Sequence, residues 1–327
     1  MKNRLLLFAT FMALIISPSL YAQNGVGFGF HDGIEDGYLK RTMEHNASRL
    51  LTAINIAEDS GGDIDYDGID IDNLASQSIG NTWKHMHMRI VDDYIAERCL
   101  CIKSKSGAVI AYQARNIKVK MEPLDDAYEG DLNQEVSIEF DRRGTISDFN
   151  ITLGNNQYQD VFKEGKRLED FDRRMQILHW IEQFRNAYIQ KDINFMNAVF
   201  SDDALIITGK VFKRQSTEIK RPKVTYTVQT KEQYLANLTK VFASNRYVNV
   251  KFDSIKIVRH PMNPNFYGVT LIQNWHGKRK DGSVYADEGT VFLVWDFTDE
   301  LKPQIHVRTW QPINDPNPIF KLSDFKI

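Results

Sequence analysis

The stretch that decides the fold runs from residue 184 to residue 204 and reads FRNAYIQKDINFMNAVFSDDA. Asp192 is placed to cap a short helix over 193–199, and the Ser-Asp-Asp turn at 201–203 leads into a strand that begins at Ala204. A longer helix precedes it, because apolar residues recur at steps of three and four: Met175, Leu178, Ile181, Phe184 and Tyr188. The order helix, helix, strand therefore opens a domain in which helices pack on a sheet.

The rest of the C-terminal half completes this pattern. We expect Asp172 to cap the long helix, and the capping box Thr-Lys-Glu-Gln at 230–233 predicts a third helix. Turn residues rich in Pro, Gly and Asp then separate four long strand-like runs, at 247–259, 266–276, 289–297 and 304–311. Helices on one face of a curved antiparallel sheet make an α+β domain.

The stretch 184–204 resembles the opening of nuclear transport factor 2-like domains, the cone folds shared by ketosteroid isomerase, scytalone dehydratase, polyketide cyclases and many non-enzymatic modules. The resemblance covers residues 171–312 and implies helices packed on a curved antiparallel sheet. It implies no single function, because one fold hosts many. The whole chain also resembles secreted two-domain proteins of gut Bacteroidota, which implies a periplasmic or surface setting.

The N-terminal half, residues 37–154, predicts a second α+β domain. A helical stripe at 37–58 is followed by strand-like runs at 92–103, 109–121, 135–140 and 145–153. We expect a helix on an antiparallel sheet, either a degenerate cone or a cystatin-like unit. The flanking segments read as a flexible lead-in at 23–36, a linker at 155–170 and an extended tail at 313–327.

The first residues predict export. Lys2 and Arg4 precede an apolar run at 5–16, and Ala22 offers a small residue for cleavage, so residues 1–22 read as a signal peptide. That run is too short to span a bilayer, and no later stretch is long and apolar enough to do so. We expect the mature chain in the periplasm or outside the cell, with no membrane span.

The charge distribution and the two cysteines limit the expected partners and chemistry of the chain. The formal net charge is −2, the N-terminal half is acidic and the C-terminal half basic, which suggests an electrostatic contact between two units. No block of Lys and Arg alternates with aromatic residues, so nucleic acid is not an expected partner. Cys99 and Cys101 either form a redox pair or act as small apolar residues, and we favour the second interpretation.

The last strand carries the candidate ligand pocket. Residues two apart on a strand share a face, so His306, Arg308 and Trp310 are expected side by side, where they suit an anionic or planar ligand. The alternative is an exposed sheet face or a surface where the domains pack. Other elements supply the remaining pocket candidates: Tyr188, Asp203, Gln273 and Trp275. Among them, Asp203 is expected to orient the ring of His306.

An acidic loop offers the favoured metal candidate. Asp63, Asp65, Asp67 and the following Gly68 match the start of a calcium-binding loop, in which oxygen ligands stand at positions 1, 3 and 5. The position that requires a bidentate Glu is Leu74, so a solvated turn is the favoured interpretation and weak calcium binding the alternative.

No catalytic motif is present, although Tyr188 and Asp203 are acid–base candidates by residue type. The first hypothesis is therefore a non-catalytic binding or scaffold protein, with a small molecule or a protein as partner and a homodimer as one expected assembly. The alternatives are an isomerase or lyase with a pocket at His306 and Arg308, and a calcium-binding extracellular module. Apart from weak calcium binding, no cofactor is expected.

Overall fold

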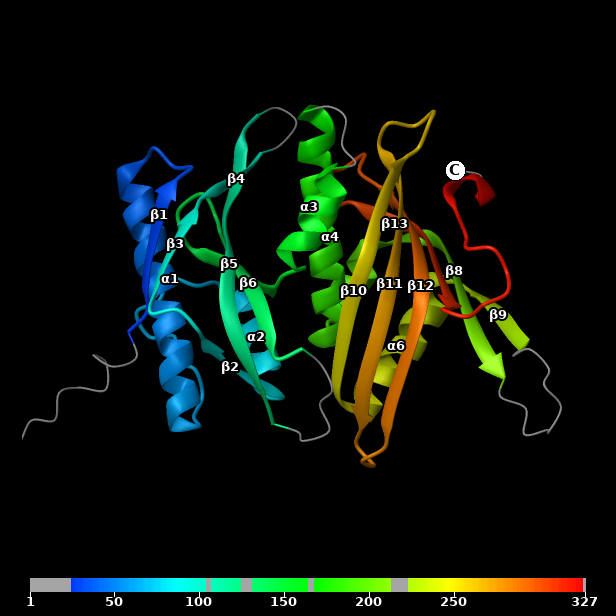
Figure 1. The fold of residues 1–327 in the computed structure, drawn as a ribbon, viewed down its shortest axis with the longest axis horizontal. Helices are drawn as coiled ribbons and strands as arrows, with labels where there is room; N and C mark the ends of the chain where they lie inside the picture. The colour runs from blue at the N-terminus through cyan, green and yellow to red at the C-terminus, as the bar shows by residue number, and fades with distance from the viewer. Residues whose placement is uncertain (1–24, 104–106, 125–130, 164–167, 213–222, 326–327) are drawn as a thin grey trace, which may run out of the picture.

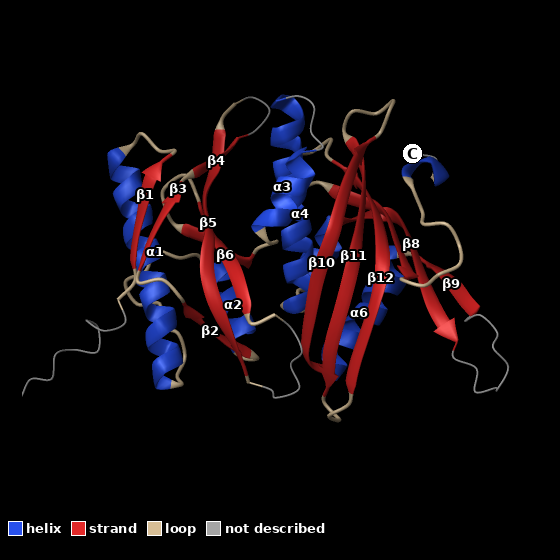
Figure 2. Ribbon diagram, in the orientation of Figure 1, coloured by secondary structure: helices blue, strands red, loops and turns tan. Residues whose placement is uncertain are grey.

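The computed structural model describes residues 25–103, 107–124, 131–163, 168–212 and 223–325. The predicted signal peptide lies outside these residues. Two α+β domains stand side by side, as the sequence predicts, and the long helix α4 (Leu168–Ile189) lies between their sheets (Figures 1 and 2). Within the described residues, no helix has the length and apolar character needed to cross a membrane.

The N-terminal domain packs helices α1 (Gly37–Ser60) and α2 (Asn73–Trp83) on one face of a five-stranded antiparallel sheet. Met43 and Leu50 of α1 are fully buried against this sheet, in one core with Ile138 and Phe140. The strands run in the order β2-β5-β6-β7, with β4 also paired to β5: β2 (Met86–Ile90), β4 (Leu100–Lys103), β5 (Val109–Pro123), β6 (Asn133–Phe140) and β7 (Ile146–Ile151).

The lead-in is ordered, so its prediction as a flexible segment is wrong. Strand β1 (Gly27–Asp32) pairs in parallel with β3 (Tyr94–Arg98). Phe28 and Phe30 point into the core, while a Cβ added to Gly27 would come within 2.6 Å of the Tyr94 ring. The glycines therefore serve a close approach between the strands rather than flexibility.

The predicted linker is also structured. Helix α3 (Asn155–Lys163) occupies most of it and buries Tyr158 and Val161 in the core of the C-terminal domain. Helix α4 begins at Leu168 and not at Asp172, so Asp172 lies within the helix and does not cap it. Helix α3 was not predicted, because its sequence is polar and aperiodic. A nine-residue helix needs few apolar contacts when it packs on a larger domain, so it shows no clear apolar stripe.

The C-terminal domain is built on one six-stranded sheet with the order β10-β11-β12-β13-β8-β9. Its strands are antiparallel except for the parallel pair β13 and β8, and β9 was not predicted. The bounds are β8 (Phe200–Phe212), β9 (Lys223–Gln229), β10 (Asn245–Arg259), β11 (Phe266–Arg279), β12 (Val284–Asp296) and β13 (Gln304–Pro312).

Three helices cover the inner face of this sheet: α4, α5 (Ile193–Val199) and α6 (Lys231–Ser244). The predicted caps of the two shorter helices are confirmed. The Asp192 carboxylate accepts from the backbone of Asn194 and Phe195, and the capping box between Thr230 and Gln233 is formed.

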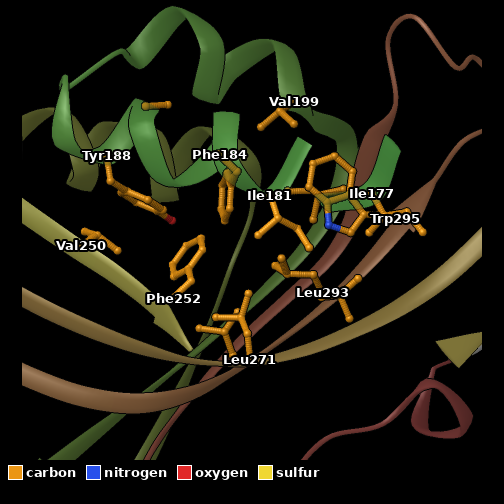
Figure 3. Packing of buried hydrophobic residues seen from close by; sticks show 14 of the residues in the cluster. Ile177, Ile181, Phe184, Tyr188, Val199, Val250, Phe252, Leu271, Leu293 and Trp295 are labelled. Atoms are coloured by element: carbon orange, nitrogen blue, oxygen red, sulfur yellow. The ribbon is translucent and has the colours of Figure 1, made fainter. Parts of the chain in front are cut away.

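Aromatic and aliphatic side chains fill the space between α4 and the sheet (Figure 3). Phe184 lies with its ring centroid 5.0 Å from that of Tyr188 and 6.4 Å from that of Trp295, and Phe252 and Leu271 close the layer from the sheet. This packing fixes α4 on the sheet through one of its faces and leaves the opposite face to the N-terminal domain.

The C-terminal tail packs on the outer face of the sheet. Phe325 stacks on Phe292 at 5.9 Å with an interplanar angle of 8°, and Gln311 fixes the tail through hydrogen bonds to the carbonyl of Pro318 and the N–H of Phe320. The tail thereby covers a small apolar patch: Phe266, Phe292, Val294 and Val307.

Candidate functional site

A β-bulge in β13 divides the predicted pocket. Across from β12, Val307 pairs with Val294 but Ile305 pairs with Trp295, so the pleat shifts at His306. Ile305 lies in the inner core, whereas Val307 lies in the outer patch. The prediction that His306 shares a face with Arg308 and Trp310 is therefore wrong, because strict alternation holds only along an unbroken strand.

His306 lies on the outer side of the sheet, with its ring centroid 5.5 Å from that of Phe266. The predicted neighbour Asp203 is beside it, at 3.6 Å from Nδ1, and Asp296 lies 3.6 Å from Nε2. The Ser201 hydroxyl donates to Asp203 at 2.6 Å and lowers the pKa of that carboxyl. The Asp203 side chain is 85% exposed, so this group is a surface cluster and not part of a pocket with Arg308.

The other pocket candidates meet inside the cone. Arg308 is buried, and its Nη2 donates to Gln273 Oε1 at 3.4 Å. The Tyr188 and Tyr234 hydroxyls are 2.7 Å apart, and the Arg308 guanidinium lies 5.2 Å from the centre of the Tyr234 ring. Trp275 packs against Tyr188 at 5.6 Å, and Trp310 packs on the same core.

This inner cluster is poorly suited to acid–base chemistry. Burial raises the pKa of Tyr188 well above its usual value, although the charge of Arg308 opposes the shift. The hydroxyl therefore stays protonated at neutral pH and cannot act as a base. The sequence did not point to Tyr234 as part of this cluster, because its place in the apolar stripe of α6 marked it only as a core residue.

The acidic loop does not gather metal ligands. Asp65 accepts the backbone N–H of Asp67 at 2.9 Å, and the Arg49 guanidinium from α1 donates to the Asp67 carbonyl at 3.0 Å. Among the residues that the structure describes, no three His, Cys, Asp or Glu side chains converge on a metal position, Asp63, Asp65 and Asp67 included. Hydrogen bonds within the chain hold the loop in this conformation, and weak calcium binding by it stays a prediction.

A cleft of about 1220 Å³ opens between the two domains. Residues of strands β4 and β5 in the N-terminal domain line one side, and residues of helix α4 with turns of the C-terminal domain line the other. Figure 1 shows β4 and β5 beside α4. The sequence did not predict this cleft, which exists only because two separate domains pack against the same helix.

A buried polar network joins the two domains beside the cleft. Arg115 of β5 pairs with Glu182 of α4 through two hydrogen bonds of 3.0 and 2.7 Å, and the Leu153 N–H donates to the same carboxylate at 2.8 Å. Asn186 donates to Asn150 at 2.8 Å. Burial favours the neutral form of Glu182, but Arg115 outweighs this effect and lowers the pKa of the carboxyl.

The network ends at the cleft. Gln113, Glu139 and Asp148 are register partners across β5, β6 and β7, so they form a polar row on the face that meets α4. Gln113 is 3% exposed, and its Nε2 has no hydrogen-bond partner within the described residues. The same holds for Glu139 Oε2, which lies 3.8 Å from Nε2 of His179 on α4.

Glu139 is a carboxyl in this cleft whose surroundings change its titration. Burial raises the pKa of its carboxyl, the charge of His179 opposes the shift, and Asp148 adds to it. Perturbed carboxyls in clefts are frequent at functional sites. The sequence signal was the polar face of the strand predicted at 135–140, which carries Glu135, Ser137 and Glu139 and could also have faced solvent.

The two cysteines are free. Cys99 is buried, and burial raises the pKa of its thiol to about 12. Cys101 is exposed and lines the cleft. They therefore differ in their surroundings, because the chain bends between β3 and β4 and does not run as one strand.

No protein-family model matches this chain, and no curated protein matches it. Solved structures that resemble it include a nuclear transport factor 2-like protein from Salmonella enterica, with 13% identity over 44% of this chain and 92% of that chain, at a TM-score of 0.34. A scytalone dehydratase-like protein from Novosphingobium aromaticivorans matches with 11% identity over 43% and 83% of the two chains, at a TM-score of 0.33. Naphthalene 1,2-dioxygenase with bound indole matches with 6% identity over 52% and 92%, at 0.36.

These neighbours thus include a nuclear transport factor 2-like protein and a scytalone dehydratase-like protein. Because these TM-scores are low, it is the order of helices and strands that identifies the cone. Two helices, two strands, a third helix and a four-stranded meander close into one sheet with β8 beside β13. The C-terminal domain has the predicted nuclear transport factor 2-like fold.

Proposed function

We propose that this chain is an exported, non-catalytic binding protein that takes a small molecule in the cleft between its two domains. One observation supports this above the others: buried polar atoms of Gln113 and Glu139 line a cleft of about 1220 Å³ without hydrogen-bond partners of their own in the described structure. Ligand sites are concave and mostly apolar, with a few polar groups that fix orientation. Export rests on the signal-peptide pattern at residues 1–22.

The cleft has the apolar walls that such a site requires. Leu100, Ile110 and Ala111 come from the N-terminal domain, and Met175 and Trp180 come from α4. The interior of the cone is less suitable, because a cluster of aromatic side chains packs there and the guanidinium of Arg308 is buried beside it. The proposed binding site therefore moves from the predicted pocket on β13 to the contact between the domains.

The test is to fill the cleft. Benzamide, benzyl alcohol and indole are offered to the mature chain, and saturation-transfer NMR measures their contact with the protein. Ala111→Trp places a large ring among the cleft walls and is expected to abolish the contact. Ala236→Trp, on the exposed side of α6, is the matched control. Equal contact in both variants, or no contact with the unaltered chain, would contradict the proposal.

A second candidate function is acid–base catalysis in the same cleft, and the raised pKa of Glu139 beside His179 favours it. It replaces the predicted isomerase or lyase pocket, because His306 and Arg308 lie on opposite faces of β13. Exchange of the methyl protons of acetophenone in D₂O, followed by NMR, tests for proton abstraction next to a carbonyl. If the unaltered chain accelerates the exchange and Glu139→Gln abolishes the acceleration, the chain is a catalyst. If the exchange runs at the rate measured in buffer alone, the proposal of a binding protein stands.

A further inference from the structure

We infer that the cleft selects an uncharged ligand that carries an amide, and that Gln113 and Glu139 hold this amide between them. The inference rests on the proposed function and adds the chemistry of the ligand. Gln113 contributes a hydrogen-bond donor, and Glu139 contributes an acceptor.

The two side chains stand directly opposite each other. Gln113 and Glu139 are register partners on the antiparallel strands β5 and β6, so their Cβ atoms are about 4.5–5.5 Å apart on one face. Arg115 Nη1 donates to Gln113 Oε1 at 3.2 Å, which uses the amide oxygen and leaves the buried Nε2 without a hydrogen-bond partner among the described residues. A donor beside an acceptor complements the edge of an amide, whose carbonyl accepts and whose N–H donates.

The charged groups that line the cleft are mixed in sign, because Lys103, Asp172 and Arg259 line it in addition to two ion pairs. Arg115 pairs with Glu182, and Arg173 pairs with Glu300, so these four groups neutralise one another. A carboxylate placed at Gln113 would meet Glu139 on the next strand. A cation would meet one carboxyl whose charged form is disfavoured by burial.

Buried polar atoms without a hydrogen-bond partner also make the site selective between ligands. A buried site that hydrogen-bonds one group of a ligand strongly rejects an analogue that lacks the group, because its own donor or acceptor is then left unpaired. Trp180, stacked with Phe195 at 6.2 Å, adds an aromatic wall that accepts a flat ring but does not distinguish an amide from a ketone.

Three probes of equal shape separate these contributions: benzamide, acetophenone, which keeps the carbonyl but has no N–H, and benzoate, which is charged. Calorimetric or NMR titration of the mature chain is expected to show benzamide binding about tenfold more tightly than either analogue. Gln113→Leu is expected to weaken benzamide about tenfold. Gln77→Leu, on the exposed side of α2, is the matched control and leaves the affinity unchanged.

Glu139→Leu separates the loss of one hydrogen bond from damage to the fold, because damage would weaken the binding of every probe. It removes the acceptor for the amide N–H and is expected to weaken benzamide about tenfold while acetophenone binds as before. If acetophenone and benzamide bind equally, or benzoate binds most tightly, the amide inference is wrong although the cleft remains a binding site. If Ala111→Trp leaves all three affinities unchanged, the proposed function fails as well.

Discussion

Glu182 is one of the buried residues of α4 that join the two domains. It is buried on α4, and its carboxylate accepts from Arg115 and from the backbone of Leu153. Both partners belong to segments N-terminal to the C-terminal domain. A buried pair of this kind adds little stability compared with an apolar pair, but loss of one partner leaves an uncompensated buried charge.

Glu182→Ala is therefore expected to lower the free energy of unfolding by about 3–5 kcal/mol. Urea denaturation followed by circular dichroism and by tryptophan fluorescence measures the loss. Glu122→Ala removes an exposed partner of Lys120 and is expected to cost less than about 1 kcal/mol. A loss at Glu182 as small as that of the control would show that the pair does not hold the domains together.

Glu139 makes stability depend on pH. Burial raises the pKa of its carboxyl above the usual 4.5, so the folded chain holds this proton at pH values where the unfolded chain has lost it. The free energy of unfolding therefore falls as pH rises through the window between the usual and the raised pKa. Glu139→Gln removes this contribution.

Melting curves at about pH 4 and at about pH 8 test this pH dependence. The stability of Glu139→Gln relative to the unaltered chain is expected to rise from the lower pH to the higher. Glu135→Gln, on the same strand, provides the comparison, since no comparable rise is expected there. A rise of the same size in both variants would show that the effect is not specific to Glu139.

At the scale of elements, the bulge in β13 shows where sequence periodicity fails. The alternation from His306 to Trp310 predicted one polar face, but the shifted pairing with β12 turns His306 outward and keeps Arg308 inward. A bulge inserts one residue without a consistent mark in the sequence of its own strand. In contrast, the caps of α5 and α6 were predicted correctly, because a cap depends on side chains within one turn of the helix.

The capping box of α6 gives the element-scale prediction. Thr230→Ala removes the acceptor for the Gln233 N–H and is expected to lower the free energy of unfolding by about 1 kcal/mol. Urea denaturation measures it. Thr239→Ala, in the exposed middle of the same helix, is the control, because its hydroxyl only bonds back to the Leu235 carbonyl and its loss changes stability little. Equal losses in the two variants would show that the cap does not stabilise α6.

At the scale of the whole molecule, the tail covers apolar surface of the sheet. A chain that ends at Pro318 loses the contacts of Phe320, Leu322 and Phe325 with the outer patch. It is expected to lose about 2–3 kcal/mol of stability and to bind an apolar dye. Dye fluorescence and light scattering measure the exposed patch. Ile319→Ser, at a side chain that is 52% exposed, is the control, and unchanged dye binding by the shortened chain would contradict the prediction.

The sequence by itself indicated the α+β class and the strand-like runs that became β6 and β7. These features follow from periodicity, which acts between residues close in the chain, whereas the cone of the C-terminal domain was implied by the resemblance of residues 184–204. The sequence also indicated that Tyr188, Gln273, Trp275 and Arg308 lie near one another, although it included His306 in error.

Only the tertiary structure decided where a ligand can bind. The cleft forms because one face of α4 packs on the cone and the other packs on the N-terminal sheet, so that Glu139 comes to face His179 across the domain contact. The same applies to β1, where Gly27 permits close packing on Tyr94. The physical reason is that a polar strand face has the same sequence pattern whether it meets solvent or another domain. Contacts between segments distant in the chain decide which of the two covers that face.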